Sequence, residues 1–583
     1  MTGASAALVT ELLSPFHLLR RAPLSVAWLA LASAAAIYLI RLPPKLTTPP
    51  IRAFEAVAAV MTTIVAGITG LTAILSPPNS ADAMAYHLPR VVYWAQSGSV
   101  AFFPTPYFNQ ITLPPMAEYL MLHTYVITGG DHLVNLIAWA AFLGCIAGVS
   151  AIAAALGLGP RAQAMAALLC ATLPNAILQA SGAKNDMLLA FWLVCAVYFA
   201  ARGDAAFTGF AIGLALATKA TAYLFLPVLL LPMAGLPKRK QTAAWLAAGI
   251  LTVNAPQYAR NIGLTGSPLG YDSAQGNGVF RWRNETFGWK QTLSNALRHT
   301  SEQLGARSPQ WNQSVYRAAI AMHRALQMDA QDPATTWPGA RFDAPINANH
   351  EANANNRWHL LLIVAAAIFA VASRSRTWTI YAGGLALAFL LFCGYLKWQP
   401  FLARLELPLF VLAAPLVAYL LQSLRLAVLQ LAVCLLLFSA ARPALVENWT
   451  RPLHGPHSLF STARNGNYFA DMSQWNNRAS YLESVARTAA SGCGTVGIDI
   501  SENQLEYPFQ ALLRERNPSV CFLHTGVQNA SSRYAPPHPP QPCAVFCPDC
   551  IGNQEKIAMY RGVGPPIEIG RFLLFLIPGD SRS

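Results

Sequence analysis

Charged side chains are scarce in this sequence. Only 11% of its 583 residues are Asp, Glu, Lys or Arg, whereas 54% are hydrophobic. Soluble domains carry about 25% charged residues. The scarcity of charge, together with repeated apolar runs, excludes an ordinary soluble protein and indicates a multi-pass membrane protein.

Acidic residues are scarcer than basic ones, and the net charge is +14. In a soluble protein such an excess would suggest a nucleic-acid partner. This sequence, however, lacks zinc-finger spacing, a Walker loop and a glycine-rich nucleotide motif, and its Lys and Arg residues cluster in short loops between apolar runs. We therefore interpret the excess as a determinant of membrane orientation and expect no nucleic-acid partner.

The apolar runs predict a mainly α, polytopic membrane protein. A spanning helix needs about 17 to 25 apolar residues, and on this measure about twelve spans are predicted. They are 23–40, 53–76, 133–157, 163–180, 187–201, 205–218, 221–236, 242–258, 358–373, 377–396, 407–421 and 426–441. The first lacks a small-residue cleavage site and is expected to be a retained anchor, as an extra helix or a hairpin. Segment 115–128, which Glu118 and His123 interrupt, is interpreted as an interfacial helix.

Basic residues mark every second connection between the predicted spans. By the positive-inside rule these connections are cytoplasmic. The two long loops, 77–132 and 259–357, then lie outside together with the tail, which gives a membrane domain 1–441 and a tail domain 442–583. The basic residues are Arg161, Arg202, Lys238, Arg239, Lys240, Arg374, Arg376 and Arg425.

The tail is predicted to be a small α/β domain, with strands at 495–500 and 571–577 and a helix at 505–516. It contains five of the ten cysteines. Three of them, in "QPCAVFCPDC", lack a fourth nearby ligand, so disulfides are expected in preference to a zinc site. The pairing stays open, because five cysteines leave one unpaired. The five are Cys493, Cys521, Cys543, Cys547 and Cys550.

Polar residues stand at the outer ends of several predicted spans. Charge at membrane depth costs about 2.5 to 3.5 kcal/mol, so it is tolerated mainly beside a cavity or a partner. In "DAMAYHLPR", a helix would place Asp82, Tyr86 and Arg90 on one face, although Pro89 would disturb the turn. The segment is either a capped surface helix or the carrier of a carboxylate base, Asp82.

Four further stretches of this kind follow along the chain. Each has an ordinary explanation, such as a helix cap, a snorkelling lysine or an Arg404–Glu406 surface pair. Together they place several cations on the same side of the membrane as Asp82, an arrangement that suits a phosphate-linked lipid head group. The residues concerned are Lys184, Asp186, Lys219, Arg260, Lys397, Arg404 and Glu406.

Several motifs resemble the bacterial branch of the GT-C glycosyltransferases, a superfamily that includes protein O-mannosyltransferases and the aminoarabinose transferases of lipid A. The resemblance covers roughly residues 53–441. Its motifs are "DAMAYHLPRVVYWAQSGSV", "KNDMLLAFW", "GLALATKATAYLFLP", "QYARNIGLTGSPLG", "KWQPFLARLELPLFVLAAP" and "EANANNRWHLLL".

The resemblance implies an enzyme that takes a polyprenyl-phosphate sugar as donor and works on the outer face of the membrane. An acid in the first external loop serves as base, and Asp82 matches it by position. Many relatives carry paired acids there, whereas "SADAMAYH" has one; Glu118 is the candidate second acid. The implied location is a bacterial plasma or inner membrane, with the active site and the tail on the periplasmic or extracytoplasmic side.

The expected reaction is an inverting transfer to an acceptor hydroxyl, with Asp82 as base. Cations hold the leaving phosphate, and neighbouring side chains orient the substrate. The phosphate ligands are expected to be Lys184, Arg260, Lys397 and Arg404. The remaining candidate substrate contacts are Tyr86, His87, Arg90, Glu118, Asp186, Lys219, Glu351 and Gln399.

The expected partners are the polyprenyl-phosphate sugar donor, membrane lipid, and a lipid, glycan or protein acceptor. The sequence requires no cofactor, and a divalent cation stays open. Two other functions are alternatives: a transporter or flippase of lipid-linked sugars, and a non-catalytic membrane scaffold. A transporter is expected to show inverted repeats and charges near mid-span. Neither is evident here, which favours the enzyme.

Overall fold

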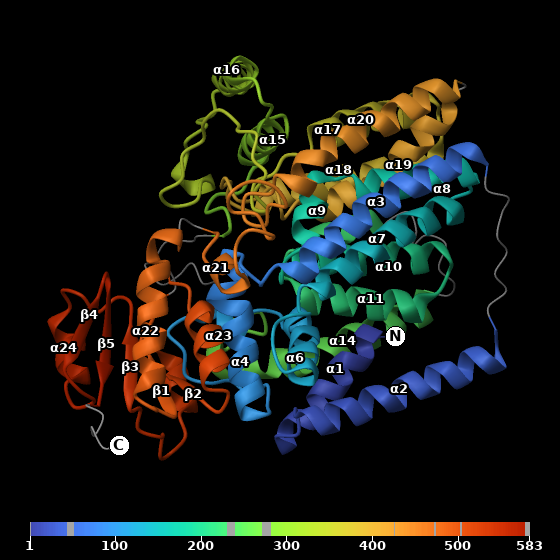
Figure 1. Ribbon diagram of the computed structural model, residues 1–583. Coiled ribbons are helices and arrows are strands. Elements are labelled where there is room, and N and C mark those ends of the chain that lie inside the picture. Colours follow the sequence, from blue (N-terminus) through green and yellow to red (C-terminus); the bar gives the residue numbers. More distant parts are fainter. Residues whose placement is uncertain are drawn as a thin grey trace.

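The computed structural model describes residues 2–43, 52–229, 239–270, 282–424, 426–471, 474–501 and 504–577. A bundle of apolar helices forms one side of the molecule, and a part that contains a small sheet lies beside one end of it (Figure 1). We call this end of the bundle the loop end. The chain is thus mainly helical, with a small C-terminal sheet, as predicted.

Five described helices are long and apolar enough to cross a membrane. A sixth span exists if the bent pair α8 (Pro160–Ala171) and α9 (Pro174–Ala180) is counted as one. Leu173 has ψ 114° because the ring of Pro174 disfavours a helical residue before it, and the pair bends by 65°. The five are α2 (Arg21–Arg41), α3 (Ala53–Leu75), α7 (Leu136–Ala155), α18 (Arg376–Tyr395) and α20 (Ala427–Val446).

The predicted number of about twelve spans is not confirmed. Four more apolar helices are shorter: α10 (Asp186–Ala201), α11 (Ala205–Thr218), α17 (Arg357–Ala372) and α19 (Leu407–Ser423). The predicted span 242–258 falls within α14 (Arg239–Thr265). The predicted span 221–236 begins as α12 (Ala222–Phe225) and the turn η3 (Leu226–Leu229), and its remainder lies outside the described residues, as do Lys238 and Arg425.

An unpredicted helix, α1 (Thr2–Leu13), precedes the first apolar run and is followed by the turn η1 (Ser14–Phe16). A Cβ at Gly3 would lie 2.6 Å from the ring of Trp192, so the missing side chain lets α1 pack closely onto the bundle. In contrast, only 6% of the apolar window of α2 is buried, and α2 runs along the edge of the molecule (Figure 1).

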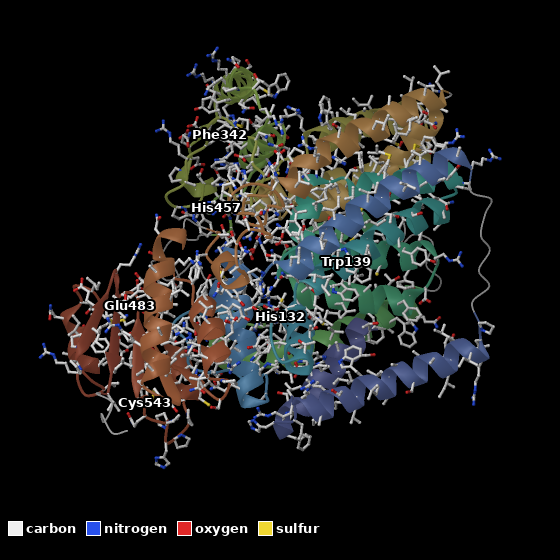
Figure 2. The ribbon with its side chains drawn as sticks, viewed as in Figure 1. His132, Trp139, Phe342, His457, Glu483 and Cys543 are labelled. Atoms are coloured by element: carbon white, nitrogen blue, oxygen red, sulfur yellow. A yellow bond between two sulfur atoms is a disulfide. The ribbon has the colours of Figure 1, made fainter. Side chains whose placement is uncertain are left out.

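Side-chain hydrogen bonds connect the bundle helices in addition to apolar packing. Trp139, which Figure 2 labels within the bundle, donates from Nε1 to the carbonyl oxygen of Ala66 on α3 at 2.9 Å. On α11, a Cβ at Gly209 would lie 2.4 Å from the carbonyl oxygen of Trp245 on α14. Small residues of this kind allow helix backbones to approach closely in a membrane.

The described parts of the two long loops contain helices and lie at the loop end. The first contains the π-helical turn η2 (Ala83–His87), then α4 (Leu88–Ser97), α5 (Asn109–Thr112) and α6 (Met116–Thr128). The helix α6 coincides with the predicted interfacial helix. The second loop contains α15 (Trp289–Gln303), α16 (Pro309–Ala325) and the turn η5 (Pro333–Thr335).

The C-terminal sheet has the strand order β2-β1-β3-β5-β4. Its first three strands are parallel, and β5 pairs antiparallel with β3 and β4. The predicted strands at 495–500 and 571–577 are β1 and β5. The strands are β1 (Thr495–Ile498), β2 (Cys521–His524), β3 (Ala544–Cys547), β4 (Pro566–Ile569) and β5 (Phe572–Leu576).

Short helices surround this sheet, and the predicted helix at 505–516 is α23. Two disulfides, Cys493–Cys543 and Cys547–Cys550, reinforce the sheet, and Cys521 is free and exposed. Figure 2 shows Cys543 at the lower edge of this part. The helices and turns are α21 (Arg464–Asn467), η6 (Gln474–Asn477), α22 (Arg478–Ala490), α23 (Tyr507–Arg516), η7 (Ala530–Tyr534) and α24 (Gln554–Tyr560).

Candidate active site

Asp82 stands directly before the π-helical turn η2, at the loop end of α3. The local sequence explains the wide turn. Pro89 has no N–H, so the carbonyl of Ala85 loses its helical partner, and Nε2 of Gln110 donates to that oxygen instead at 3.0 Å. Single π-turns within helices are frequent at functional sites.

The wide turn changes which side chains accompany Asp82. The expectation that Asp82, Tyr86 and Arg90 share one face is wrong for Arg90, which donates to Glu118 at 3.3 Å. Tyr86 stays within electrostatic range of Asp82, and so does His87. One extra residue in the turn is enough to rotate Arg90 away from the position that a regular helix would give it.

Arg404 forms an ion pair with Asp82. It comes from the connection between α18 and α19, more than three hundred residues along the chain. The alternative explanation, an Arg404–Glu406 surface pair, is therefore wrong. Glu406 instead contacts His299 at 2.8 Å and accepts a hydrogen bond from Gln303 at 2.8 Å.

A second ion pair lies next to the first. Lys219, directly after α11, contacts Asp186, the first residue of α10, with Nζ and Oδ1 2.5 Å apart. Arg404 and Lys184 are within electrostatic range of both Asp82 and Asp186. The second acid near Asp82 is thus Asp186, and not Glu118. We call Asp82, Asp186, Lys184, Lys219 and Arg404 the Asp82 cluster.

Glu351, which is buried, holds Lys184 of the Asp82 cluster in place. It accepts a hydrogen bond from Nζ of Lys184 at 3.1 Å and forms an ion pair with Arg451. Arg451 also donates to Oδ1 of Asn79 at 2.9 Å, three residues before Asp82. Sequence reasoning missed Arg451, because it lies in the tail, and no periodicity connects it with residue 79 or 351.

Exposure distinguishes the members of this set. The side chain of Asp82 is 24% exposed, and those of Arg404 and Lys219 are 15% and 17% exposed. Asp186 and Glu351 are each only 2% exposed. Asp82 is therefore the carboxylate of the set that a substrate can reach, beside two cations that are also accessible.

The charges around Asp82 determine its protonation state. Burial alone would raise the pKa of its carboxyl, but Arg404 and then Lys184 hold that pKa well below the usual range. Asp82 is therefore ionised at neutral pH. With three cations and two carboxylates, the Asp82 cluster has one positive charge in excess and is suited to binding an anion.

Glu118 is the centre of a separate, fully buried group. Its Oε1 lies 2.9 Å from Nδ1 of His87 and 3.3 Å from Nη1 of Arg90, and no part of these side chains is exposed. Arg90 also donates to the carbonyl oxygens of Ile111 and Leu113 at 2.8 and 2.9 Å. We call Glu118, His87 and Arg90 the Glu118 cluster.

Two of the expected phosphate ligands lie elsewhere. Arg260 is held by Glu11 on α1, at 2.7 and 2.9 Å, and by the hydroxyl of Tyr119 at 2.8 Å. Lys397 is buried and contacts Glu285 at 2.5 Å. Among the described contacts, none joins Lys397, Gln399 or Arg260 to Asp82.

The described residues contain one group of three side chains whose spacing suits a metal ion, namely Asp499, Cys547 and Cys550. The two cysteines are joined in a disulfide, so neither offers a thiolate ligand. In the Asp82 cluster, Asp82 and Asp186 each already have a cationic partner.

No protein-family model and no curated protein matches this sequence. Among solved structures, the chain is similar to ArnT from Cupriavidus metallidurans bound to undecaprenyl phosphate. The two share 14% identity over 90% of this chain and 98% of that one, with a TM-score of 0.49. The apo state of ArnT gives 14% identity over 93% and 98% of the chains, and a TM-score of 0.48.

The chain is also similar to the Archaeoglobus fulgidus oligosaccharyltransferase tethered with an acceptor peptide. The identity is 12% over 86% of this chain and 70% of that one, with a TM-score of 0.42. ArnT and the oligosaccharyltransferase are GT-C glycosyltransferases, the superfamily that the sequence motifs resemble. We infer the function below from this chain's own side chains.

Proposed function

We propose that this protein is a membrane glycosyltransferase that moves a sugar from a polyprenyl-phosphate donor to an acceptor hydroxyl, with inversion at the anomeric carbon. The observation that carries the proposal is the Asp82 cluster. An ionised, accessible carboxylate stands beside two accessible cations, at the end of an apolar helix bundle. This combination places a base and an anion site where a lipid-linked phosphate can arrive.

In the proposed reaction, the acceptor oxygen attacks the anomeric carbon and gives its proton to the carboxylate of Asp82. The bond between the anomeric carbon and the phosphate oxygen breaks, and the phosphate leaves with the electron pair. Arg404, Lys219 and Lys184 stabilise its developing charge, so no general acid is required. Asp186 and Glu351 hold the two lysines in place.

The ion pair between Asp82 and Arg404 gives the donor a second role. In the free protein, the cations make Asp82 a weak base, because they lower its pKa. An anionic phosphate that binds Arg404 would offset this positive charge and raise the pKa of Asp82. The base would then become strong only when the donor is bound, which limits unproductive chemistry.

The loop end would face away from the cytoplasm. Arg161 at the start of α8, Arg202 after α10 and Arg374 after α17 support this orientation, since each lies at the end of its helix that is opposite to the loop end. The sugar donor and its acceptor would then meet on the outer side of the membrane.

The test is direct transfer by the purified full-length chain. Polyprenyl-phosphate hexose and polyprenyl-phosphate pentose are supplied with extracted envelope lipids and glycans. Free polyprenyl phosphate and the glycosylated product are then measured by mass spectrometry. We expect both products in equal amounts, and NMR of the new linkage should show inversion.

The same assay separates the alternatives. A transporter would move the donor across a vesicle membrane and release no free polyprenyl phosphate. A scaffold would neither move the donor nor release free polyprenyl phosphate. Release that is unchanged in Asp82→Asn would refute the assignment of Asp82 as the base.

A further inference from the structure

A cavity of about 320 Å³ lies away from Asp82, between the loop ends of α17 and α20. It is lined by the first residues of α17, the last two turns of α20 and the segment 347–356. Three arginines belong to its wall: Arg307, Arg357 and Arg442. We call it the arginine pocket. None of its lining residues belongs to the Asp82 cluster.

The arginine pocket has an excess of positive charge. Arg307 and Arg442 share a single acid, Glu447, at 3.7 and 3.6 Å. These separations are longer than a hydrogen bond, so both guanidinium groups keep donors for another partner. Among the described residues, no carboxylate pairs with Arg357, whose guanidinium lies over the ring of Trp358 at 4.9 Å. An anionic group would satisfy all three.

The start of α17 adds to this preference for an anion. Its N-cap residue, Asn356, makes no side-chain capping bond. Asn356 instead donates to Gln303 and accepts from the backbone N–H of Asn175. The positive end of the helix dipole therefore faces the pocket beside Arg357.

The surface next to the arginine pocket is apolar. One turn into α17, Leu361 and Val364 are 46% and 49% exposed, and on α20 Leu435 and Leu436 are 52% and 40% exposed. Away from these arginines both helices are predominantly apolar, and α20 is long enough to span a membrane. A ligand that fits the whole region has a phosphate at one end and hydrocarbon chains at the other.

We propose that the arginine pocket binds the phosphate head group of an anionic phospholipid, as a second lipid site separate from that of the sugar donor. The phosphodiester lies among Arg307, Arg357 and Arg442, and the acyl chains lie along the exposed apolar faces of α17 and α20.

Hydrogen bonds of Asn175 connect the arginine pocket indirectly with the Asp82 cluster. Asn175 does not line the pocket, but it bridges Asn356 and Glu351. Its backbone N–H donates to Asn356 at 3.2 Å, and its Nδ2 donates to the carbonyl oxygen of Glu351 at 3.3 Å. Glu351 in turn holds Lys184. A lipid in the pocket therefore steadies the segment 351–356, which carries an anchor of the active site.

The test is lipid retention by the purified full-length chain, measured by native mass spectrometry. The probes are dioleoyl-phosphatidylglycerol and the zwitterionic dioleoyl-phosphatidylcholine. We expect a preference of about tenfold or more for phosphatidylglycerol in the wild type, because basic residues attract anionic lipid. The variant Arg307→Gln/Arg357→Gln/Arg442→Gln should lose this preference, and Ser439→Trp, which fills the pocket without changing charge, should weaken retention as well.

Two controls make the result specific. Arg317→Gln/Arg324→Gln/Arg341→Gln removes three exposed arginines of the same loop region and should retain phosphatidylglycerol like the wild type. Arg404→Gln should also retain it, because Arg404 belongs to the donor site. This second control keeps the lipid proposal separate from the proposed transfer reaction.

Three outcomes would overturn the proposal. The first is equal retention by the pocket variant and the control variant. The second is equal retention of phosphatidylglycerol and phosphatidylcholine by the wild type. The third is displacement of the lipid by millimolar inorganic phosphate, which would assign the pocket to a free anion.

Discussion

The Asp82 cluster and the Glu118 cluster contain similar residue types, but they differ in how exposed their carboxylates are to a substrate. Both contain a carboxylate from the first long loop with an arginine as partner. Asp82 is 24% exposed, whereas Glu118 and its two partners have no exposed surface. A substrate can therefore reach the first carboxylate and not the second. The comparison shows that two things distinguish a reactive carboxylate from a structural one: how deeply the carboxylate is buried, and what else its arginine partner contacts.

The largest expected effect comes from Asp82→Asn, which keeps the shape of the side chain but removes the proton acceptor. We expect transfer to fall about 10³-fold, within the range of 10² to 10⁴ that a general base contributes. Because Asp82 and Arg404 are partly exposed, the melting temperature should change little. Turnover and thermal unfolding are measured on the same preparation. Turnover near the wild-type value would remove the distinction between the two clusters.

The opposite pattern is expected for Glu118→Gln. Removing this charge leaves Arg90 and His87 buried without a carboxylate, at a cost of about 3 to 5 kcal/mol of stability. The rate per folded molecule should stay close to that of the wild type. Denaturant unfolding and active-site-normalised turnover check the two halves of this expectation. A lower rate with unchanged stability would return Glu118 to the role of second acid.

The sequence predicted this division only in part. Apolar runs located most of the bundle helices, because a long apolar run is a strong local signal, but they did not predict α1 or the bend between α8 and α9. The lone polar residues Asp82, Lys184, Lys219 and Arg404 were also visible, since each interrupts or borders such a run. Their partners were not predictable, because the pairing of Arg404 with Asp82 or of Arg451 with Glu351 depends on tertiary contacts between distant segments.

Local rules also misled where a single residue changes the geometry. The regular-helix assumption placed Arg90 with Asp82, but the π-turn before Pro89 rotates it toward Glu118. Glu11 was missed because no apolar run precedes residue 23 with the length of a span, yet α1 brings it to Arg260. In each of these cases the charged residue was known from the sequence, but its partner in the folded protein was not predicted.

Arg404→Gln should reduce kcat/KM about 10- to 100-fold, since a hydrogen bond to a charged group is worth about 1.5 to 3 kcal/mol. Arg404→Lys, which keeps the charge but not the planar fork, should recover part of the loss. Steady-state kinetics with a polyprenyl-phosphate sugar measure both. An equal loss in the two variants would show that geometry matters here and charge does not.

The pH dependence sharpens the contrast further. Arg404 and Lys184 depress the pKa of Asp82 below its unfolded value, so the base stays ionised as the pH falls through the ordinary range of Asp. The stability that this pairing contributes is present above the unfolded pKa and is lost as the pH falls through the folded one. We expect the acid limb of kcat/KM to lie below the ordinary pKa of Asp in the wild type, and to move upward in Arg404→Gln. A limb in the same place in both would show that Arg404 does not set the charge of Asp82.

The smallest effect is expected for Lys397→Met, although the sequence predicted Lys397 as a phosphate ligand. Its Nζ contacts Glu285, whose side chain is 38% exposed, so the acid that loses its partner is solvated rather than stranded. The methionine fills the space of the lysine stem, and turnover should stay within about twofold of the wild type. Lys184→Met is the matched comparison, because it removes a buried lysine of the same size that is within electrostatic range of Asp82. Both lysines have little exposed surface. A large loss of turnover in Lys184→Met and none in Lys397→Met would therefore show that proximity to Asp82 decides which buried cation matters for transfer.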